Sequence, residues 1–158
     1  MEKFQTRQSL DSIFNARSVA LIGASDDPKK FGFMTLRSHI TAGFKGPIYP
    51  INPKGGELMG LKVYPTLKEI PSSIDLAVII IPAKFVPQTL LDAAAKGAKG
   101  AVVLSGGFRE AGRPDLENEI IKISRQKNIR ILGPNIQGIN YLPNNLCAMF
   151  FPVIKTRG

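Results

Sequence analysis

The sequence is poor in several residue types that carry common kinds of chemistry. Among 158 residues there are one cysteine, one histidine and no tryptophan. The lone Cys147 excludes an internal disulfide framework and a cysteine zinc cluster. The one histidine, His39, is too few for an HExxH metal motif, and we identify no Ser-His-Asp set in the sequence. We therefore expect a binding domain with no catalytic centre and no metal site. Cys147 is expected to be a small apolar residue, and His39 a surface or packing residue.

Long apolar segments are also missing. The longest run, around 76–82, has the length of a strand and falls short of the ~18–20 residues that a membrane span needs. Residues 1–7 lack the apolar stretch that is typical of a signal peptide. The expectation from both observations is a cytoplasmic protein with no membrane partner.

Acidic residues are few relative to basic ones, 12 against 21, so the net charge is +9 and the pI is near 9.9. A positive surface favours anionic partners. Nucleic-acid modules, however, usually gather Lys and Arg on one face and place aromatic residues among them. Here the basic residues are scattered in runs of two at most. We expect no nucleic-acid partner, which leaves a solvated basic surface or a polyanionic small ligand.

Short apolar segments alternate with helical patterns along the chain. Strands are predicted at 18–22, 47–51, 75–81, 101–104 and 129–132, with a further extended piece at 62–64. Helices are predicted at 10–14, 33–42, 87–96 and from 114 onward, with one helical turn at 66–70. This alternation indicates an α/β fold, a single Rossmann-like domain with a doubly wound parallel sheet. Residues 139–158 are predicted to be irregular or β-like.

Two helices have apolar residues at helical spacing. Phe33, Leu36 and Ile40 are predicted to share the buried face of the helix at 33–42, which Gly43 ends. In the helix that begins near Pro114, the residues Leu116, Ile120 and Ile123 recur at i, i+4 and i+7.

Every predicted strand is followed by a loop of small or polar residues. These loops are 23–25, 52–54, 82–84, 105–108 and 133–135. In sheets of this class, ligands bind outside the carboxyl ends of the strands, near the switch in strand order. We therefore expect the five loops to form one long cleft that suits an extended ligand.

The first loop has features of a phosphate site. Gly23 lets the backbone approach a phosphate closely, and the hydroxyl of Ser25 can donate to a phosphate oxygen. The helix N-terminus near Gly32 offers free N–H groups, and Lys30 adds a mobile cation. The pair Asp26–Asp27 is expected to point outward. A plain turn with solvated lysines is the alternative interpretation.

The second loop differs from that of an NAD-binding domain. Such domains usually carry an acid here for the ribose, whereas this chain has Asn52, Pro53 and Lys54. Pro53 fixes the chain direction and Lys54 can pair with a phosphate. The loop therefore favours a ligand with an extra phosphate, and coenzyme A, with its 3′-phosphate, is the predicted cofactor. For Lys54 alone, an exposed turn lysine is the alternative.

The later loops extend the predicted site. Gly106 and Gly107 would expose backbone amides, and Phe108 can stack on an adenine, shield a pantetheine arm, or belong to the core. Asn135, in a rigid loop after Pro134, can bond to a ligand amide or thiol region. The predicted cofactor-binding residues are Gly23, Ala24, Ser25, Lys30, Gly32, Asn52, Pro53, Lys54, Ile81, Pro82, Ser105, Gly106, Gly107, Phe108, Pro134 and Asn135.

The ordered loops resemble the N-terminal CoA-binding domain of NDP-forming acyl-CoA synthetases, the ADP-forming acetate–CoA ligase family that is related to the succinyl-CoA synthetase α subunit. The likeness spans about 10–151, and its segments are IFNARSVALIGAS (13–25), INPK (51–54), IPA (81–83), GFRE (107–110) and LGPN (132–135). The resemblance implies CoA phosphates near Ser25, Lys30 and Lys54, and a thiol end near 133–135. Lys29 and the pair at 136–137 depart from the usual residues of the family.

The resemblance also implies a reaction in which acid, CoA and ATP give acyl-CoA, ADP and phosphate. The family's phosphohistidine lies on a following α/β domain, and the nucleotide binds an ATP-grasp module, so His39 does not take that role. The chain ends at 155–158, about where the connection to the second domain is expected. We interpret 1–158 as one CoA-binding domain of a larger enzyme, not catalytic alone. A regulatory module of a protein lysine acetyltransferase, a free-standing nucleotide-sensing protein and a homo-oligomer remain open.

Overall fold

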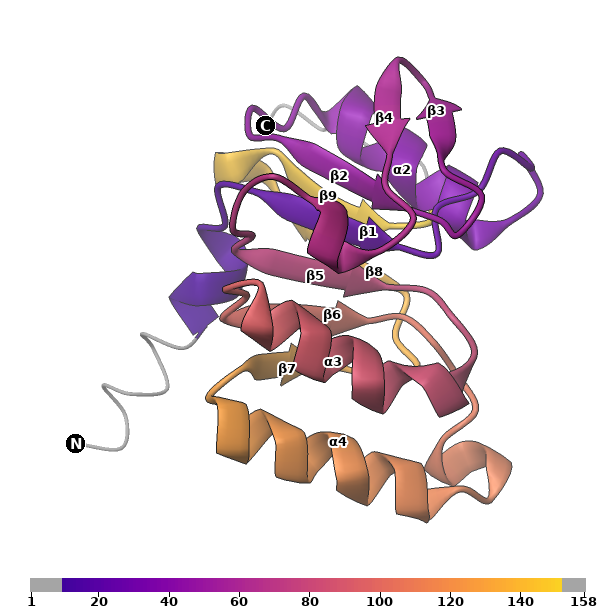
Figure 1. The fold of residues 1–158 in the computed structure, drawn as a ribbon, viewed down its shortest axis with the longest axis vertical. Coiled ribbons are helices and arrows are strands. Elements are labelled where there is room, and N and C mark those ends of the chain that lie inside the picture. The colour runs from indigo at the N-terminus through magenta and orange to yellow at the C-terminus, as the bar shows by residue number, and fades with distance from the viewer. Residues whose placement is uncertain (1–9, 152–158) are drawn as a thin grey trace.

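A five-stranded parallel sheet forms the centre of the computed structural model, which describes residues 10–151 (Figure 1). Its strands are β1 (Val19–Ile22), β2 (Ile48–Ile51), β5 (Leu76–Ile79), β6 (Gly100–Val103) and β7 (Arg130–Leu132). Their order is β2-β1-β5-β6-β7, and all neighbours are parallel. After β2 the chain returns to the other side of β1, so the strand order switches between β1 and β5. The predicted doubly wound α/β sheet is confirmed.

The sheet separates two hydrophobic cores. Successive side chains of a strand point to opposite faces. In β1, Val19 and Leu21 accordingly pack in one core, while Ala20 and Ile22 pack in the other. All four side chains are buried, which explains why the central strands are continuously apolar rather than alternating.

Helices cover both faces of the sheet. The helix α2 (Phe31–Ala42) places Leu36 in the core with Val19 and Leu21. The opposite core is covered by α3 (Val86–Ala95) and α4 (Pro114–Lys127), which contact each other; Figure 1 shows α3 in front of the sheet and α4 beside it. In α4 the buried residues are Leu116, Ile120 and Ile123, as their spacing predicted.

The buried face of α2 differs from the predicted one. Ile40 is 39% exposed and Phe33 is half-buried, so the predicted apolar face is wrong except for Leu36. Apart from Leu36, the residues that are buried are small or polar, namely Gly32, Thr35, Ser38, His39 and Ala42. Small side chains are needed here because a strand, β9 (Leu146–Met149), packs closely along this helix.

An antiparallel hairpin shares the α2 face of the sheet. It consists of β8 (Gly138–Tyr141) and β9, and it buries Leu146, Cys147 and Ala148 completely. The β-like prediction for the last part of the chain is therefore confirmed for 139–141 and 146–149. A second hairpin joins β3 (Gly56–Leu58) to β4 (Leu61–Val63), where the sequence predicted only a turn and an extended piece.

The remaining elements are single turns. Residues 10–14 are helical, as predicted. The 3-10 helices are η1 (Leu67–Glu69), η2 (Ala83–Phe85), η3 (Arg109–Ala111) and η4 (Leu142–Asn144). None of the helices described within 10–151 is long and apolar enough to cross a membrane. The predictions that concern 1–7 and 155–158 fall outside the described residues.

Candidate functional site

The carboxyl ends of β5, β6 and β7 line a cavity of about 560 Å³. Its lining comes from the loops at 80–82, 104–106 and 135–137, and from Phe31 and Phe150 on the opposite side. The volume lies within the ~300–1,000 Å³ that is usual for small-molecule pockets. The position, beside the switch between β1 and β5, is where open α/β sheets bind their ligands. This cavity is the candidate functional site.

Two aromatic side chains form an apolar wall of the cavity. Phe31 is the first residue of α2, and Phe150 directly follows β9. Their ring centroids are 4.3 Å apart, and Phe31 remains 54% exposed. Sequence reasoning missed both residues. Phe31 stands between the predicted site residues Lys30 and Gly32, but only the packing of the β8–β9 hairpin against α2 brings Phe150 to it.

Polar side chains also line the cavity. Asn135 and Gln137, two residues apart after β7, are exposed and line the cavity. The backbone of Asn135 has a positive φ of 56°, and its N–H donates to the Ser105 carbonyl oxygen at 2.9 Å. The loop after β7 is thus bonded to the loop after β6. The cavity is lined by both side-chain amides and aromatic rings.

Ser105 holds the lining together through its hydroxyl. Its Oγ accepts a hydrogen bond from the Ile81 N–H at 3.0 Å and donates to the Ile79 carbonyl oxygen at 3.4 Å. The residue is buried. Five of the predicted site residues line this one cavity, namely Ile81, Pro82, Ser105, Gly106 and Asn135. Within it, Ser105 fixes the loop after β5 to the loop after β6.

The loop after β6 corrects two expectations. The amides of Gly107 and Phe108 are occupied, because both donate to Glu110 Oε1, at 2.6 and 3.2 Å. The ring of Phe108 is fully buried in the core under α3 and α4. It cannot stack on an adenine, so only the core alternative holds for its side chain. A large apolar ring gains more by burial than by lying on a polar loop.

The loop after β1 is packed tightly against its neighbours. The N–H groups of Gly23 and Ala24 both donate to the Ile51 carbonyl oxygen at 3.1 Å. Gly23 has a φ of 98°, and a Cβ at this position would lie 2.0 Å from the Ile80 carbonyl oxygen. A Cβ at Gly32 would lie 1.9 Å from the Gly23 carbonyl oxygen. The two glycines therefore allow α2 to begin directly above the end of β1.

Short hydrogen bonds shape the turn between β1 and α2. Ser25 is buried, and its Oγ accepts from the Asp27 N–H at 3.1 Å. The Asp27 carboxylate in turn accepts from the Lys29 N–H at 3.0 Å, while Asp26 is exposed. Lys30 is the N-cap residue of α2, is exposed, and makes no side-chain cap bond. The N-terminus of α2 is thus left without a capping side chain or an acid in its first turn.

Asn52 links the loops after β2 and β1. Its Nδ2 donates to the Ala24 carbonyl oxygen at 2.7 Å, and its Oδ1 accepts from the Lys54 N–H at 2.9 Å. The side-chain amide therefore orients both loops. Pro53 and Lys54 remain exposed beside Ala24 and Ser25. The predicted juxtaposition of the first two loops is present, with Asn52 as its connection.

The cavity includes three of the five predicted loops. It spans the ends of β5, β6 and β7, and it also takes in Phe31, the first residue of α2. The residues at 23–25 and 52–54 lie outside its lining. Pro134 is also not part of it, because it lines a separate groove of about 190 Å³ against α4. The next residue, Asn135, lines the cavity instead, and its positive φ marks a change of chain direction between the two.

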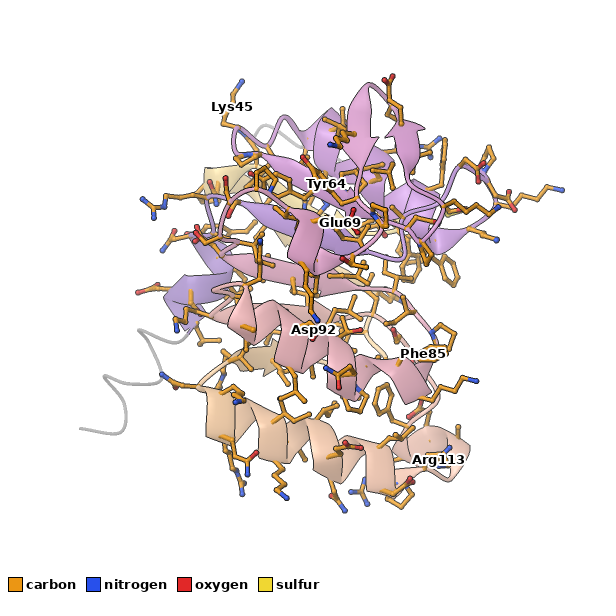
Figure 2. All side chains as sticks on the ribbon, in the orientation of Figure 1. Lys45, Tyr64, Glu69, Phe85, Asp92 and Arg113 are labelled. Atoms are coloured by element: carbon orange, nitrogen blue, oxygen red, sulfur yellow. The ribbon has the colours of Figure 1, made fainter. Side chains whose placement is uncertain are left out.

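Charge is distributed unevenly along this edge of the sheet. Exposed lysines follow β1, β2 and β5, at positions Lys29, Lys30, Lys54 and Lys84. Beside them, Phe85 is 52% exposed with Lys84 Nζ 4.9 Å from its ring centroid; Figure 2 shows Phe85 at the edge where the strands end. The segment after β6 carries Glu110 and two arginines, Arg109 and Arg113, which are ion-paired with Glu117 and Asp115, and the loop after β7 contributes neutral amides. Lysines therefore gather on one side of this edge, whereas the arginines on the other side are paired with carboxylates.

The reactive side chains of the chain lie away from the cavity lining. His39 is fully buried on α2, and burial lowers its pKa to about 4. Cys147 is fully buried on β9, and burial raises its pKa to about 11, so both groups are neutral near pH 7. Residues 10–151 contain no group of three or more His, Cys, Asp or Glu that could hold a metal ion.

Comparison with known proteins assigns these loops to a family. A family model described as a CoA binding domain matches residues 17–141. The alpha subunit of ADP-forming acetate–CoA ligase I from Pyrococcus furiosus is 45% identical over 150 residues, which are 91% of this chain and 32% of the relative. The ADP-forming acetate–CoA ligase of Methanocaldococcus jannaschii is 44% identical, over 90% of this chain and 20% of the relative.

A solved structure gives the same result. The dinucleotide-forming acetyl-coenzyme A synthetase 1 from Ca. Korarchaeum cryptofilum, in complex with phosphate and ADP, matches with a TM-score of 0.86. It is 44% identical and covers 90% of this chain and 31% of that chain. The chain described here spans a third or less of the length of these relatives.

Proposed function

The chain belongs to the CoA-binding domain family, as the order of its loops predicted, and we propose that it is the coenzyme A-binding part of an ADP-forming acyl-CoA synthetase. Coenzyme A is the ligand to which the family match points. The observation that carries the proposal is the combination of a cavity at the strand ends with a row of lysines on one side of it.

The lysine-rich side suits the phosphates of the ligand. Gly23 and Ser25 lie at the end of β1, and the uncapped N-terminus of α2 presents the positive end of its dipole. Lys30 and Lys54 add two cations on either side of this turn. We assign the pyrophosphate to Ser25 and the α2 N-terminus, and the 3′-phosphate to Lys54.

The cavity suits the uncharged arm of the ligand. A pantetheine arm carries methyl and methylene groups together with two amides, and it ends in a thiol. The Phe31–Phe150 wall can cover its apolar part, and the side chains of Asn135 and Gln137 can bond to its amides. The thiol end then lies near the loop after β7, the position that the family resemblance implies.

The names of the relatives support a proposal for the reaction of the whole enzyme. In this proposal, acid, CoA and ATP give acyl-CoA, ADP and phosphate, and the phosphohistidine lies on an α/β domain that follows the CoA-binding domain. An ATP-grasp module, in the same chain or in a separate subunit, binds the nucleotide. The names of the relatives favour this synthetase over an acetyltransferase module.

The experiment that tests the proposed function is a calorimetric titration of the chain with coenzyme A. NAD, NADH and ATP serve as comparison ligands. Saturable binding of coenzyme A alone is the expected result. Tighter binding of NAD or NADH would overturn the phosphate argument, because the loop after β2 lacks an acid for the ribose.

Lys54→Glu tests the assignment of the 3′-phosphate. A lysine that meets a phosphate becomes a repulsive carboxylate, so affinity for coenzyme A should fall by about tenfold or more. Affinity for dephospho-CoA, which lacks the 3′-phosphate, should change little. Lys45→Glu is the matched control, because Lys45 is exposed and lies away from the strand ends (Figure 2). Equal weakening of both ligands would remove the assignment.

A further inference from the structure

The loop after β6 is anchored firmly at both of its ends. At one end Ser105 bonds to the backbone of Ile79 and Ile81, and its carbonyl oxygen accepts from the Asn135 N–H. At the other end the Phe108 ring is fully buried in the core. Between these anchors lie only Gly106 and Gly107, and glycine is the residue with the most backbone freedom to lose.

The first of these two glycines forms part of the cavity wall, and the second directly follows it in the chain. Gly106 lines the cavity, and a Cβ there would lie 3.1 Å from Asn135 Oδ1 and 3.4 Å from Glu110 Oε1. Gly107 has a φ of 103°, a backbone conformation that residues other than glycine rarely adopt. Without a side chain to pack, neither glycine can fix its own position. Something else must hold this part of the wall.

Glu110 supplies that support from the following turn. Its Oε1 accepts from the Gly107 and Phe108 N–H groups at 2.6 and 3.2 Å. Hydrogen bonds from Gly107, from its own N–H and from Phe108 lower its pKa, so the carboxylate is charged at neutral pH. Successive N–H groups that point to one anion form a nest. In this chain the nest is filled by the protein's own carboxylate.

The neighbouring arginine does not compete for Glu110. Arg109 Nε bonds instead to the Glu117 carboxylate of α4 at 3.1 Å. The short helix η3 thus takes part in two contacts that involve a carboxylate. The contact of Arg109 with Glu117 attaches η3 to α4, and the contact of Glu110 with the Gly107 N–H attaches η3 to the loop after β6.

We propose that Glu110 is a positioning residue. Its carboxylate fills the nest and holds Gly107, and through it the adjoining Gly106, which is the part of the wall against which the uncharged arm of the ligand lies. This role rests on the proposed binding of coenzyme A. It also separates the two ends of the ligand, because an occupied nest offers no site to a phosphate. A ligand phosphate is left to the lysine-rich side, beside β1 and β2.

Glu110→Ala is the test, read with two ligands. Coenzyme A carries the arm, whereas adenosine 3′,5′-bisphosphate carries only the nucleotide end. The variant should bind coenzyme A about tenfold more weakly, because the ligand must then order the loop, while the bisphosphate affinity should change by less than about twofold. Glu110→Gln keeps an acceptor oxygen and should restore most of the affinity. Glu117→Ala, which breaks only the contact between η3 and α4, is the matched control.

Added formate gives a readout that a general loss of stability would not move. Formate can occupy the emptied nest of Glu110→Ala, so it should strengthen coenzyme A binding by that variant and not by the wild type. Amide exchange at Gly107 and Phe108 should be faster in the variant and slower again with formate. The proposal would be overturned if Glu110→Ala lost affinity equally for both ligands, or lost affinity for neither. It would also be overturned if formate had no effect on coenzyme A binding by the variant. A wild type that binds neither ligand would instead overturn the proposed function.

Discussion

His39 shows how a single side chain can give the fold a pH dependence. It lies on the buried face of α2, where its Nδ1 bonds to the Thr35 carbonyl oxygen at 3.3 Å. Its Nε2 is buried without a hydrogen-bond partner among the described residues. Desolvation lowers its pKa from 6.5 to about 4, against a smaller opposite effect of the Thr35 bond. The folded protein therefore disfavours the protonated form.

Stability should consequently fall on mild acidification. A group whose pKa is lower in the folded state stabilises the fold above the unfolded pKa, and that contribution disappears as pH falls from about 6.5 to about 4. Between pH 7 and pH 4.5 the wild type should lose about 2–3 kcal/mol more than His39→Leu does. Urea unfolding of both proteins at the two pH values measures this difference. The same loss in both would show that His39 is not responsible.

At the scale of an element, the junction of β1 and α2 depends on backbone contact. Gly32 is buried, and a Cβ there would meet the Gly23 carbonyl oxygen, a backbone atom that cannot rotate away. A glycine near a phosphate is commonly explained by access for the ligand. Here its first role is steric, because it lets the helix begin directly above the strand end.

Gly32→Ala should therefore destabilise the fold by about 2–3 kcal/mol, as overpacking in a tight site does. Gly60→Ala is a suitable control. Gly60 lies in the turn between β3 and β4 with a φ of 78°, and nothing lies within 4 Å of its Cβ position. Only backbone strain applies there, so Gly60→Ala should lower the free energy of unfolding by about 1 kcal/mol. Comparable unfolding free energies for the two variants would contradict the steric explanation.

The helices α2 and α4, which cover opposite faces of the sheet, differ in how well the sequence predicts their buried faces. In α4, buried Leu116, Ile120 and Ile123 stand among charged residues, so the apolar stripe is unambiguous. In α2 the apolar residues Phe33 and Ile40 turn out to be partly exposed, and His39 is buried instead. The face of α2 is decided by the β9 strand that packs on it, and this strand is distant in sequence.

At the scale of the whole molecule, the β8–β9 hairpin completes the second core. Leu146 and Ala148 pack with Leu21 and Val78 of the central strands. The same hairpin brings Phe150 to Phe31 at the cavity. The hairpin therefore couples the stability of this core to the shape of the candidate site.

Cys147 provides a probe of that coupling. The thiol is fully buried on β9, and burial raises its pKa to about 11, so it should not react with iodoacetamide in the folded protein at neutral pH. Labelling across a urea series should follow the global unfolding transition measured by circular dichroism. If labelling occurred at lower urea concentrations than global unfolding, the hairpin would detach before the rest of the fold. That result would contradict the conclusion that the hairpin is part of the core.

The sequence by itself determined the alternating strands and helices, the parallel sheet, and the small-residue loops at the strand ends. These features depend on local patterns of apolar residues, glycine and proline, and the order of the loops was enough to indicate the family. Tertiary structure alone decided which loop residues face the cavity. The burial of Phe108, the pairing of Phe31 with Phe150, and the contact of Glu110 with the glycine amides arise from contacts that only packing creates.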